Sequence, residues 1–399
     1  MASTAEGLTL RDLGAPVYLP AGVFCVGTGA VAPVIVLSAT GLGASPAVAA
    51  AVVGLLGLGQ LAGALPAGAL IARTGEQPVM LGATGLALPA LLGCLLAGSV
   101  PLLGAAVFLL GVCGAAWGVA RHAYLTEAVR PDLRARAMST LGGVSRIGTF
   151  AGPFLGAAAM HAIGLRGAYL VAMACVAVSA VLLRLLPPVP HDRPPAPGGD
   201  RPGVFAVARA HARTLRTLGL GILLVGALRA SRQTILPLWG AQLGLDPATL
   251  SLVYGLSGAV DMLLFYPAGR LMDRRGRRWA AVPAMALLGA SHAVLPLAGG
   301  VTGLAVAAAL MGLGNGLSAG LILTLGADVS PAAGRAQFLG VWRLCADLGN
   351  GGGPLLIGAV TAAVSLAAAA LTMAAAGLLA AALLHRWIGA PAAGLHQKS

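Results

Sequence analysis

The chain has 399 residues, of which 58% are hydrophobic and only 9% are charged, and its formal net charge is +13. Because soluble domains contain about 25% charged residues, this composition excludes an ordinary soluble fold. The positive charge does not indicate a nucleic-acid partner, because the basic residues are distributed over short breaks between apolar stretches. The composition therefore predicts an integral membrane protein whose surroundings are the lipid bilayer.

Apolar stretches of about 20 residues follow one another along the chain, and each is long enough to cross a hydrocarbon core of about 30 Å. We predict about twelve membrane helices. Two of the breaks are very short, so eleven and thirteen are the alternatives. The approximate spans are residues 16–38, 46–71, 77–98, 101–124, 138–162, 167–186, 217–240, 248–271, 279–299, 301–325, 337–360 and 364–387.

Two distant segments of the chain are nearly the same. Pro66–Gly75 recurs as Pro267–Gly276, an offset of 201 residues, and the same offset relates Gly152-Pro153 to Gly353-Pro354. This duplication predicts an all-α membrane fold of six helices plus six. Two like halves in a membrane, related as parallel repeats, are an architecture of transporters.

A proline-rich stretch separates the two halves and cannot form a membrane helix. It predicts an N-terminal six-helix bundle over residues 1–186, a cytoplasmic linker over residues 187–215 and a C-terminal six-helix bundle over residues 216–399.

Basic residues alternate between the two sides of the expected membrane. Of the 25 basic residues, we place four inside apolar spans, namely Arg146, Arg229, Arg232 and Arg343, and one on the side reached after odd-numbered spans, namely Arg166. The rest share the other side. Because basic short loops mark the cytoplasm, we expect both termini there and the protein in the cell inner (plasma) membrane.

The five cysteines all lie within expected spans, without the spacing or the histidine neighbours of a metal site, so we interpret them as packing residues. The sequence also holds no motif of an intramembrane enzyme. We expect a protein that is not an enzyme and has no metal or cofactor.

The loop between the eighth and ninth spans resembles the signature loop of the major facilitator superfamily, Gly-x-x-x-Asp-Arg-x-Gly-Arg-Arg. The residues that carry the resemblance are Gly269, Asp273, Arg274, Gly276 and Arg277. The first-half copy keeps Gly68, Arg73 and Gly75 but lacks the aspartate. The resemblance implies a transporter of two six-helix bundles, which we expect to work as a monomer.

The resemblance also implies a clasp between these loop charges and an acidic residue at the inner end of the fourth or tenth helix. Those positions hold Glu127 and Asp328, with Arg136 and Arg335 as candidate partners. Because the first-half set is incomplete, we expect the C-terminal clasp to hold the inner gate more strongly.

The fifth span carries Gly148, Gly152, Pro153 and Gly156, which resemble the Gly-x-x-x-Gly-Pro-x-x-Gly motif of drug/proton antiporter-type exporters. Glycines at every fourth position also mark ordinary close packing of membrane helices. We interpret the motif as indicating efflux of a small organic molecule, such as a drug or a natural product. The alternative is a metabolite importer or uniporter of the same fold.

Charged side chains inside the spans predict the transport site, because each costs about 2.5–3.5 kcal/mol at a helix centre. The candidates are Asp261, Arg229, Arg232, Arg146, Arg343, Asp347 and the deep aromatic Trp117. Helix-to-helix struts are the alternative for each ion, and we leave His292 out of the site.

Asp261 is the candidate proton carrier, with Arg229 or Arg232 as its partner, and a proton gradient is the expected energy source. Arg343 pairs with Asp347 along one helix in this interpretation, and Arg146 faces Asp347. The excess of Arg predicts an anionic or zwitterionic substrate.

Overall fold

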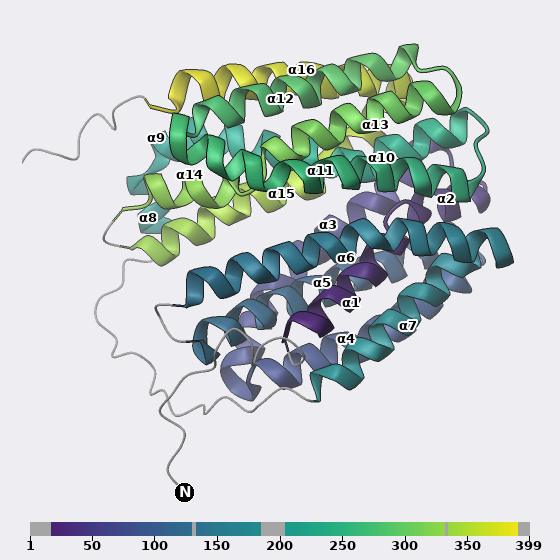
Figure 1. Cartoon of the computed structure of the whole chain (residues 1–399), viewed down its shortest axis with the longest axis horizontal. Coiled ribbons are helices and arrows are strands. Elements are labelled where there is room, and N and C mark those ends of the chain that lie inside the picture. The colour runs from purple at the N-terminus through teal and green to yellow at the C-terminus, as the bar shows by residue number, and fades with distance from the viewer. Residues whose placement is uncertain (1–16, 130–132, 185–203, 332–333, 390–399) are drawn as a thin grey trace, which may run out of the picture. The chain divides into compact units, whose positions relative to one another are not determined.

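The computed structural model describes residues 17–129, 133–184, 204–331 and 334–389, and within these ranges every regular element is helical (Figure 1). The first helices are α1 (Leu19–Val31), α2 (Val34–Gly41), α3 (Pro46–Thr74), α4 (Glu76–Leu95), α5 (Val100–Ala128), α6 (Arg134–Ile163) and α7 (Arg166–Leu183). The later ones are α8 (Val204–Ala210), α9 (Ala212–Thr214), the π-helical turn η2 (Leu215–Gly219), α10 (Leu220–Gln242), α11 (Pro247–Arg275), α12 (Arg278–Val294), the 3-10 turn η3 (Leu295–Leu297), α13 (Gly300–Leu317), α14 (Leu321–Val329), α15 (Arg335–Ala363) and α16 (Leu366–Trp387).

The chain forms two compact units. One comprises Met1–Pro197 with Gln233–Gly258, and the other comprises Gly198–Arg232 with Ala259–Ser399. Helices α10 and α11 therefore contribute residues to both units. Most of the predicted linker, residues 185–203, lies outside the described residues, and the division into six plus six helices stays a prediction.

Ten helical segments of the described chain are long and apolar enough to cross a membrane. Helices α6 and α15, with 30 and 29 residues, are also long enough but are not among the ten. These two helices correspond to the fifth and eleventh predicted spans, and they carry charged residues in their N-terminal halves. The structure thus confirms a helical protein with many potential membrane spans, and the count of twelve remains a prediction.

The duplication seen in the sequence reappears in the helix boundaries. Helices α3 and α11 each have 29 residues, and both their first and their last residues are 201 positions apart. Their N-termini are capped in the same place: Ser45 Oγ accepts the N–H of Val48 at 3.4 Å, and Asp246 Oδ1 accepts that of Thr249 at 3.0 Å. Each helix also has proline at its first position, where the missing N–H is harmless.

The two long helices end in the same way. Gly75 and Gly276 have φ values of 90° and 91°, a conformation that glycine adopts without strain. Their N–H groups donate to the carbonyls of Ile71 and Met272 at 2.8 and 3.1 Å. The turn that ends each helix therefore explains why both loop copies have glycine at this position. Gly68 and Gly269 have a different setting, because a Cβ added at either would meet nothing within 4 Å.

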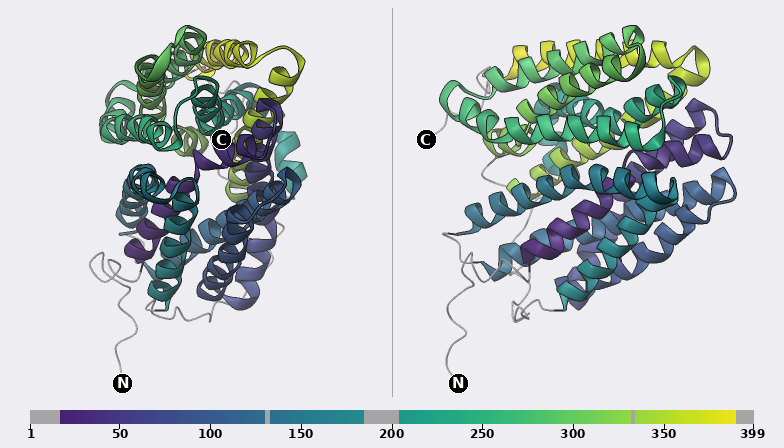
Figure 2. Two further views of the ribbon diagram at one scale, coloured as in Figure 1. Left: turned by 90° about the vertical axis from the view of Figure 1, so that its right-hand side faces the viewer. Right: turned by 45° about the vertical axis from the view of Figure 1, so that its right-hand side comes forward.

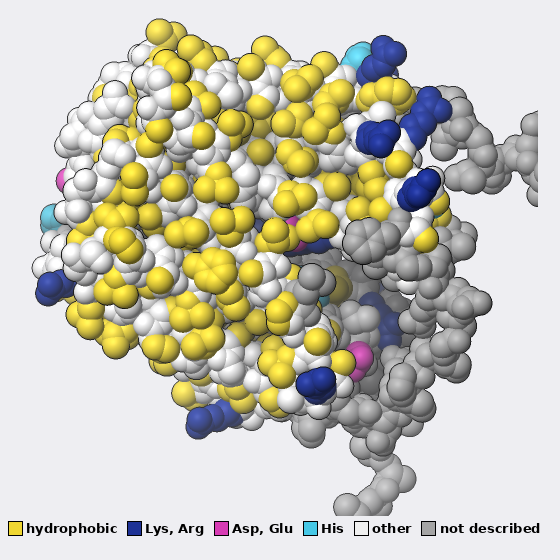
Figure 3. Space-filling view, turned by 180° about the vertical axis from the view of Figure 1, so that it is seen from behind, with side chains coloured by type: hydrophobic (Ala, Val, Ile, Leu, Met, Phe, Trp, Pro, Cys, Tyr) yellow, Lys and Arg dark blue, Asp and Glu magenta, His cyan; other side chains and the backbone are white. Residues whose placement is uncertain are grey.

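Packing within each unit is helix on helix. Helix α3 packs on α5, α1 packs on α6 and α7, and in the other unit α12 packs on α16 (Figure 2). On the face in Figure 3, hydrophobic side chains dominate the middle and basic side chains lie mostly toward the edges. Leu297 and Leu263 are 84% and 71% exposed, as is expected of side chains that face lipid.

Candidate functional site

A deeply buried ion pair joins α10 to α11 within one unit. Arg232 Nη1 lies 3.8 Å from Asp261 Oδ2, and both residues are only 9% exposed. Helix α13 closes the site from another side, because Gly316 approaches the backbone of Asp261, where a Cβ would lie 2.8 Å from its carbonyl oxygen. From the sequence we predicted Arg229 or Arg232 as the partner of Asp261. In the structure Arg232 lies beside Asp261.

Arg229, one turn before Arg232, binds the end of α13. Its Nη1 donates to Ser318 Oγ at 2.9 Å and to the Ser318 carbonyl at 3.2 Å. The guanidinium thereby satisfies a carbonyl at the C-terminus of a membrane helix, where a positive charge is favourable. Arg232 thus lies beside a carboxylate on α11, and Arg229 links α10 to the end of α13.

His292, which the sequence left out of the site, lies next to this pair. It is fully buried on α12, and its Nε2 lies 2.7 Å from Ser231 Oγ, one residue before Arg232. Its Nδ1 lies 2.6 Å from the Leu288 carbonyl, which only accepts, so Nδ1 donates. The Ser231 hydroxyl also donates to the Leu228 carbonyl at 2.7 Å, and its contact with His292 links α12 to the polar face of α10. The sequence did not predict this contact, because His292 lies on a span that we expected to be peripheral.

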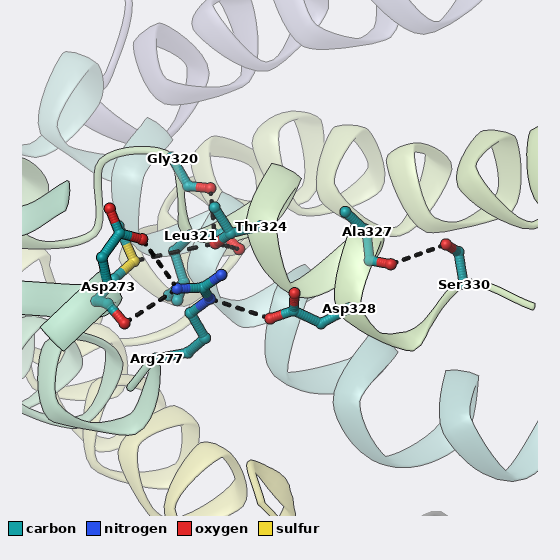
Figure 4. Close-up of polar contacts among 9 residues, drawn as sticks. Asp273, Arg277, Gly320, Leu321, Thr324, Ala327, Asp328 and Ser330 are labelled. Atoms are coloured by element: carbon teal, nitrogen blue, oxygen red, sulfur yellow. Dashed lines mark hydrogen bonds and ion pairs between the residues drawn. The ribbon is translucent and has the colours of Figure 1, made fainter. Parts of the chain in front are cut away.

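The second-half loop forms a three-residue cluster, the C-terminal clasp, at the ends of α11, α12 and α14 (Figure 4). Arg277 Nε lies 3.0 Å from Asp328 Oδ2, and Arg277 Nη1 lies 3.2 Å from Asp273 Oδ1. Nη1 also donates to the Met272 carbonyl at 3.0 Å. The structure thus brings together three of the charges predicted for the clasp.

Arg335, the fourth expected member of the C-terminal clasp, is exposed at the start of α15, and no contact joins it to Asp328 among the described residues. Arg274 is exposed at the end of α11.

The first-half copy builds no such cluster within the described residues. Arg73, Glu127 and Arg136 are all exposed and make no ion pair with one another. The difference follows from two replacements: Glu76 stands where the second copy has Arg277, and Ala72 stands where it has Asp273. The asymmetry agrees with the incomplete first-half set seen in the sequence.

Arg343 and Asp347 pair along α15, with Nε and Oδ1 3.0 Å apart. Because Arg343 is exposed and the pair lies within one helix, it does not bridge elements. Arg146 is half-buried on α6. It belongs to a different unit from Asp347, so the expected approach of these two residues stays a prediction.

The Gly-Pro motif of α6 packs against α1. A Cβ on Gly148 would overlap the carbonyl of Gly22, and one on Gly152 would overlap that of Val26. Gly156 packs less closely on α1, because a Cβ there would lie 3.3 Å from the Ala30 carbonyl oxygen. Pro153 is buried.

The partial second copy of this motif, on α15, packs against α10 in the same register. A Cβ on Gly349 would overlap the carbonyl of Leu223, and one on Gly353 would lie 2.6 Å from that of Ala227. Each of these contacts is 201 residues from its counterpart in the first half. Close helix packing therefore accounts for the glycines in both halves.

Trp117 lies in a stack that the sequence did not predict. The ring of Phe24 on α1 stacks on Trp117 with centroids 4.2 Å apart, and the guanidinium of Arg121 lies 4.8 Å from the Trp117 ring centroid. Our count of four arginines inside the spans was too low, because the spans as bounded above also contain Arg184, Arg270 and Arg386 near their ends, and Arg121. Arg121 is near the end of the fourth predicted span and is an internal residue of α5.

The sequence as a whole matches one family. A family model described as Major Facilitator Superfamily matches residues 18–230 and again residues 218–399. Together the two matches cover nearly the whole chain, with one copy in each half. A comparison with curated proteins finds no match.

Several solved transporter structures are similar to this chain. A POT family transporter in complex with 5-aminolevulinic acid is 12% identical, with a TM-score of 0.76 over 95% of this chain and 96% of that chain. The nucleoside transporter NupG is 15% identical, with a TM-score of 0.70 over 92% and 96%. A bacterial homologue of the human lysosomal transporter Spinster is 17% identical, with a TM-score of 0.72 over 94% and 96%. At such identities the likeness shows the fold alone.

Proposed function

Because this chain belongs to the major facilitator superfamily, we propose that it is a secondary active transporter that exchanges protons for a small organic molecule across the cell membrane. Parallel repeats allow a site to be exposed alternately to the two sides of a membrane. The proposal requires no cofactor, because the proton gradient supplies the energy.

The observation that supports proton coupling is the buried pair of Arg232 and Asp261. Taking two charges out of water is costly, and removing one of them leaves the other uncompensated. A proton that binds Asp261 neutralises the carboxylate and releases Arg232 from its attraction. Loss of that proton restores the pair. Each protonation state of Asp261 therefore favours a different arrangement of α10 and α11.

We propose efflux as the direction of transport. It rests on the resemblance of the motif Gly148, Gly152, Pro153 and Gly156 to that of antiporter-type exporters. The alternative is an importer or uniporter of the same fold. The close packing of these glycines is compatible with both directions.

Everted membrane vesicles test the direction. A pH gradient, acid inside, is followed with a quenched acridine dye while members of a panel of small organic molecules are added. We expect some compounds to enter the vesicles and to dissipate the gradient. Compounds that equilibrate at the same rate without a gradient would identify a uniporter, and accumulation only in right-side-out vesicles would identify an importer.

We further propose that both termini are cytoplasmic, because the short loops rich in Arg are assigned to that side. Gly41 lies before the start of α3 and Thr74 is its last residue, and both are exposed. In a variant without native cysteines, a membrane-impermeant maleimide added to intact cells should label Gly41→Cys and not Thr74→Cys. Labelling of Thr74→Cys alone would reverse the orientation.

A further inference from the structure

Three helices of one unit surround Arg121. Helix α5 carries Arg121 and Trp117, α1 carries Phe24 and Cys25, and α6 carries Ser145. Arg121 Nη1 donates to Ser145 Oγ at 3.0 Å and lies 3.9 Å from Cys25 Sγ. The guanidinium lies over Trp117, whose ring stacks on Phe24 with an interplanar angle of 7°.

This cluster, the Arg121 stack, holds two buried donors without acceptors. Arg121 Nε and Trp117 Nε1 are both inaccessible and have no hydrogen-bond partner. Within the described part of the chain, no carboxylate lies within ion-pair distance of Arg121. A buried donor left unsatisfied costs about 1–3 kcal/mol, and more when it is charged.

A structural strut does not explain these features. A strut in a membrane protein pairs its charge with a carboxylate or with several carbonyls. Ser145 and Cys25 are neutral, and both lie at Nη1. The opposite edge of the guanidinium, formed by Nε and Nη2, is the edge that binds a carboxylate with two parallel hydrogen bonds. Arg121 is half-buried, so part of the side chain is accessible.

We propose that the Arg121 stack binds the carboxylate of the transported molecule, with Nε and Nη2 of Arg121 and Nε1 of Trp117 as donors. The inference rests on the proposed transport of a small organic molecule and specifies its class as an organic carboxylate. A cation–π contact places the guanidinium over the Trp117 ring in this conformation. Nε of Arg121 and Nε1 of Trp117 are both covered here, so binding requires both side chains to rotate.

Cys25 provides a reporter inside the site. In purified protein with Cys94, Cys113, Cys175 and Cys345 changed to Ala, alkylation of Cys25 by N-ethylmaleimide measures access to Arg121. The probes are two matched pairs, benzoate with benzamide and indole-3-acetate with indole-3-acetamide. We expect at least one carboxylate to slow alkylation several-fold and its amide to leave the rate unchanged.

Three variants separate the proposed role from a structural one. Arg121→Gln should abolish the protection by carboxylate. Trp117→Phe keeps the ring stack and removes one donor, so the carboxylate should bind about tenfold more weakly. Arg270→Gln is the matched control, because Arg270 lies 4.5 Å from the Tyr266 ring centroid in an exposed stack of the same kind. This control should keep full protection.

Equal protection by the carboxylate and its amide, protection that survives Arg121→Gln, or no protection by either carboxylate would overturn the proposal. The assay uses no proton gradient, so it is independent of coupling. Protection by carboxylate together with failure of proton coupling would leave Arg121 as the binding residue of an uncoupled carrier. Proton coupling without such protection would refute the Arg121 site alone.

Discussion

Arg277 Nε lies 3.0 Å from Asp328 Oδ2, and this contact joins the start of α12 to the end of α14. Asp273 reaches the same guanidinium from α11, but its side chain is 77% exposed. Exposed ion pairs contribute about 0–1 kcal/mol each, so the C-terminal clasp is a weak latch. In the proposed transport cycle, a weak latch would let these helix ends separate and rejoin.

The two carboxylates of the C-terminal clasp should differ in effect. Asp328→Asn removes a contact between helices, whereas Asp273→Asn removes one between neighbours on consecutive turns. We expect both variants to slow transport with normal membrane insertion. Asp328→Asn should raise maleimide labelling at the helix ends that carry the C-terminal clasp more than Asp273→Asn does. The double variant Asp328→Asn with Arg277→Gln should add little to either change. Normal transport and unchanged labelling in both single variants would show that the cluster has no gating role.

Close packing of α15 on α10 predicts a large effect of a single methyl group. Gly349→Ala forces the two helices apart, and overpacking of this kind costs about 1–3 kcal/mol. Gly352→Ala is the control, because a Cβ there meets nothing within 4 Å and alanine is the better helix former. We expect the melting temperature in detergent to fall for Gly349→Ala and to stay the same or rise for Gly352→Ala. Similar melting temperatures for the two variants would contradict the packing.

The caps of α3 and α11 predict a pH dependence that only one half shows. Hydrogen bonds from Thr249 and Ala248 hold the pKa of Asp246 below its ordinary value of 3.8. Because the folded-state pKa is the lower one, the stabilisation is complete above the ordinary value and is lost as the pH falls through the folded-state pKa.

Asp246→Ser copies the cap that Ser45 provides in the first half, and this cap does not titrate. We expect the wild type to be more stable than Asp246→Ser near pH 7, because an aspartate also interacts favourably with the helix N-terminus. The difference in melting temperature should shrink as the pH falls below about 4. A difference that stays constant over this range would show that the charge of Asp246 does not contribute.

Much of the fold could be predicted from the sequence because the same local motifs occur in both halves. The loop copies that end in Gly75 and Gly276 require the same turn, and the glycines four residues apart on α6 and α15 require close helix contacts. Apolar length predicted most of the spans. It also predicted spans at α6 and α15, which carry charged residues and are not among the ten apolar segments.

Fewer contacts of the candidate site could be predicted from the sequence. Spacing alone connects Arg343 to Asp347, but the choice of Arg232 over Arg229 for Asp261 depends on how α10 rotates against α11. Arg121 was overlooked because its position near a span end resembles that of an ordinary flanking charge. Its contacts come from Cys25 on α1, 96 residues away, and from Ser145 on α6, 24 residues away, and spacing alone did not predict them.

The most direct test of the account measures proton movement through Asp261→Asn. Reconstituted vesicles that contain a pH-sensitive dye receive a gradient of a compound that dissipated the pH gradient in everted membranes. We expect the wild type and the control Asp246→Asn, which changes a carboxylate at the cap of α11, to move protons against the compound. We expect Asp261→Asn to bind or passively exchange it without proton movement. Proton flux that persists in Asp261→Asn at normal expression would contradict the account and leave the Arg232–Asp261 pair as a strut between α10 and α11.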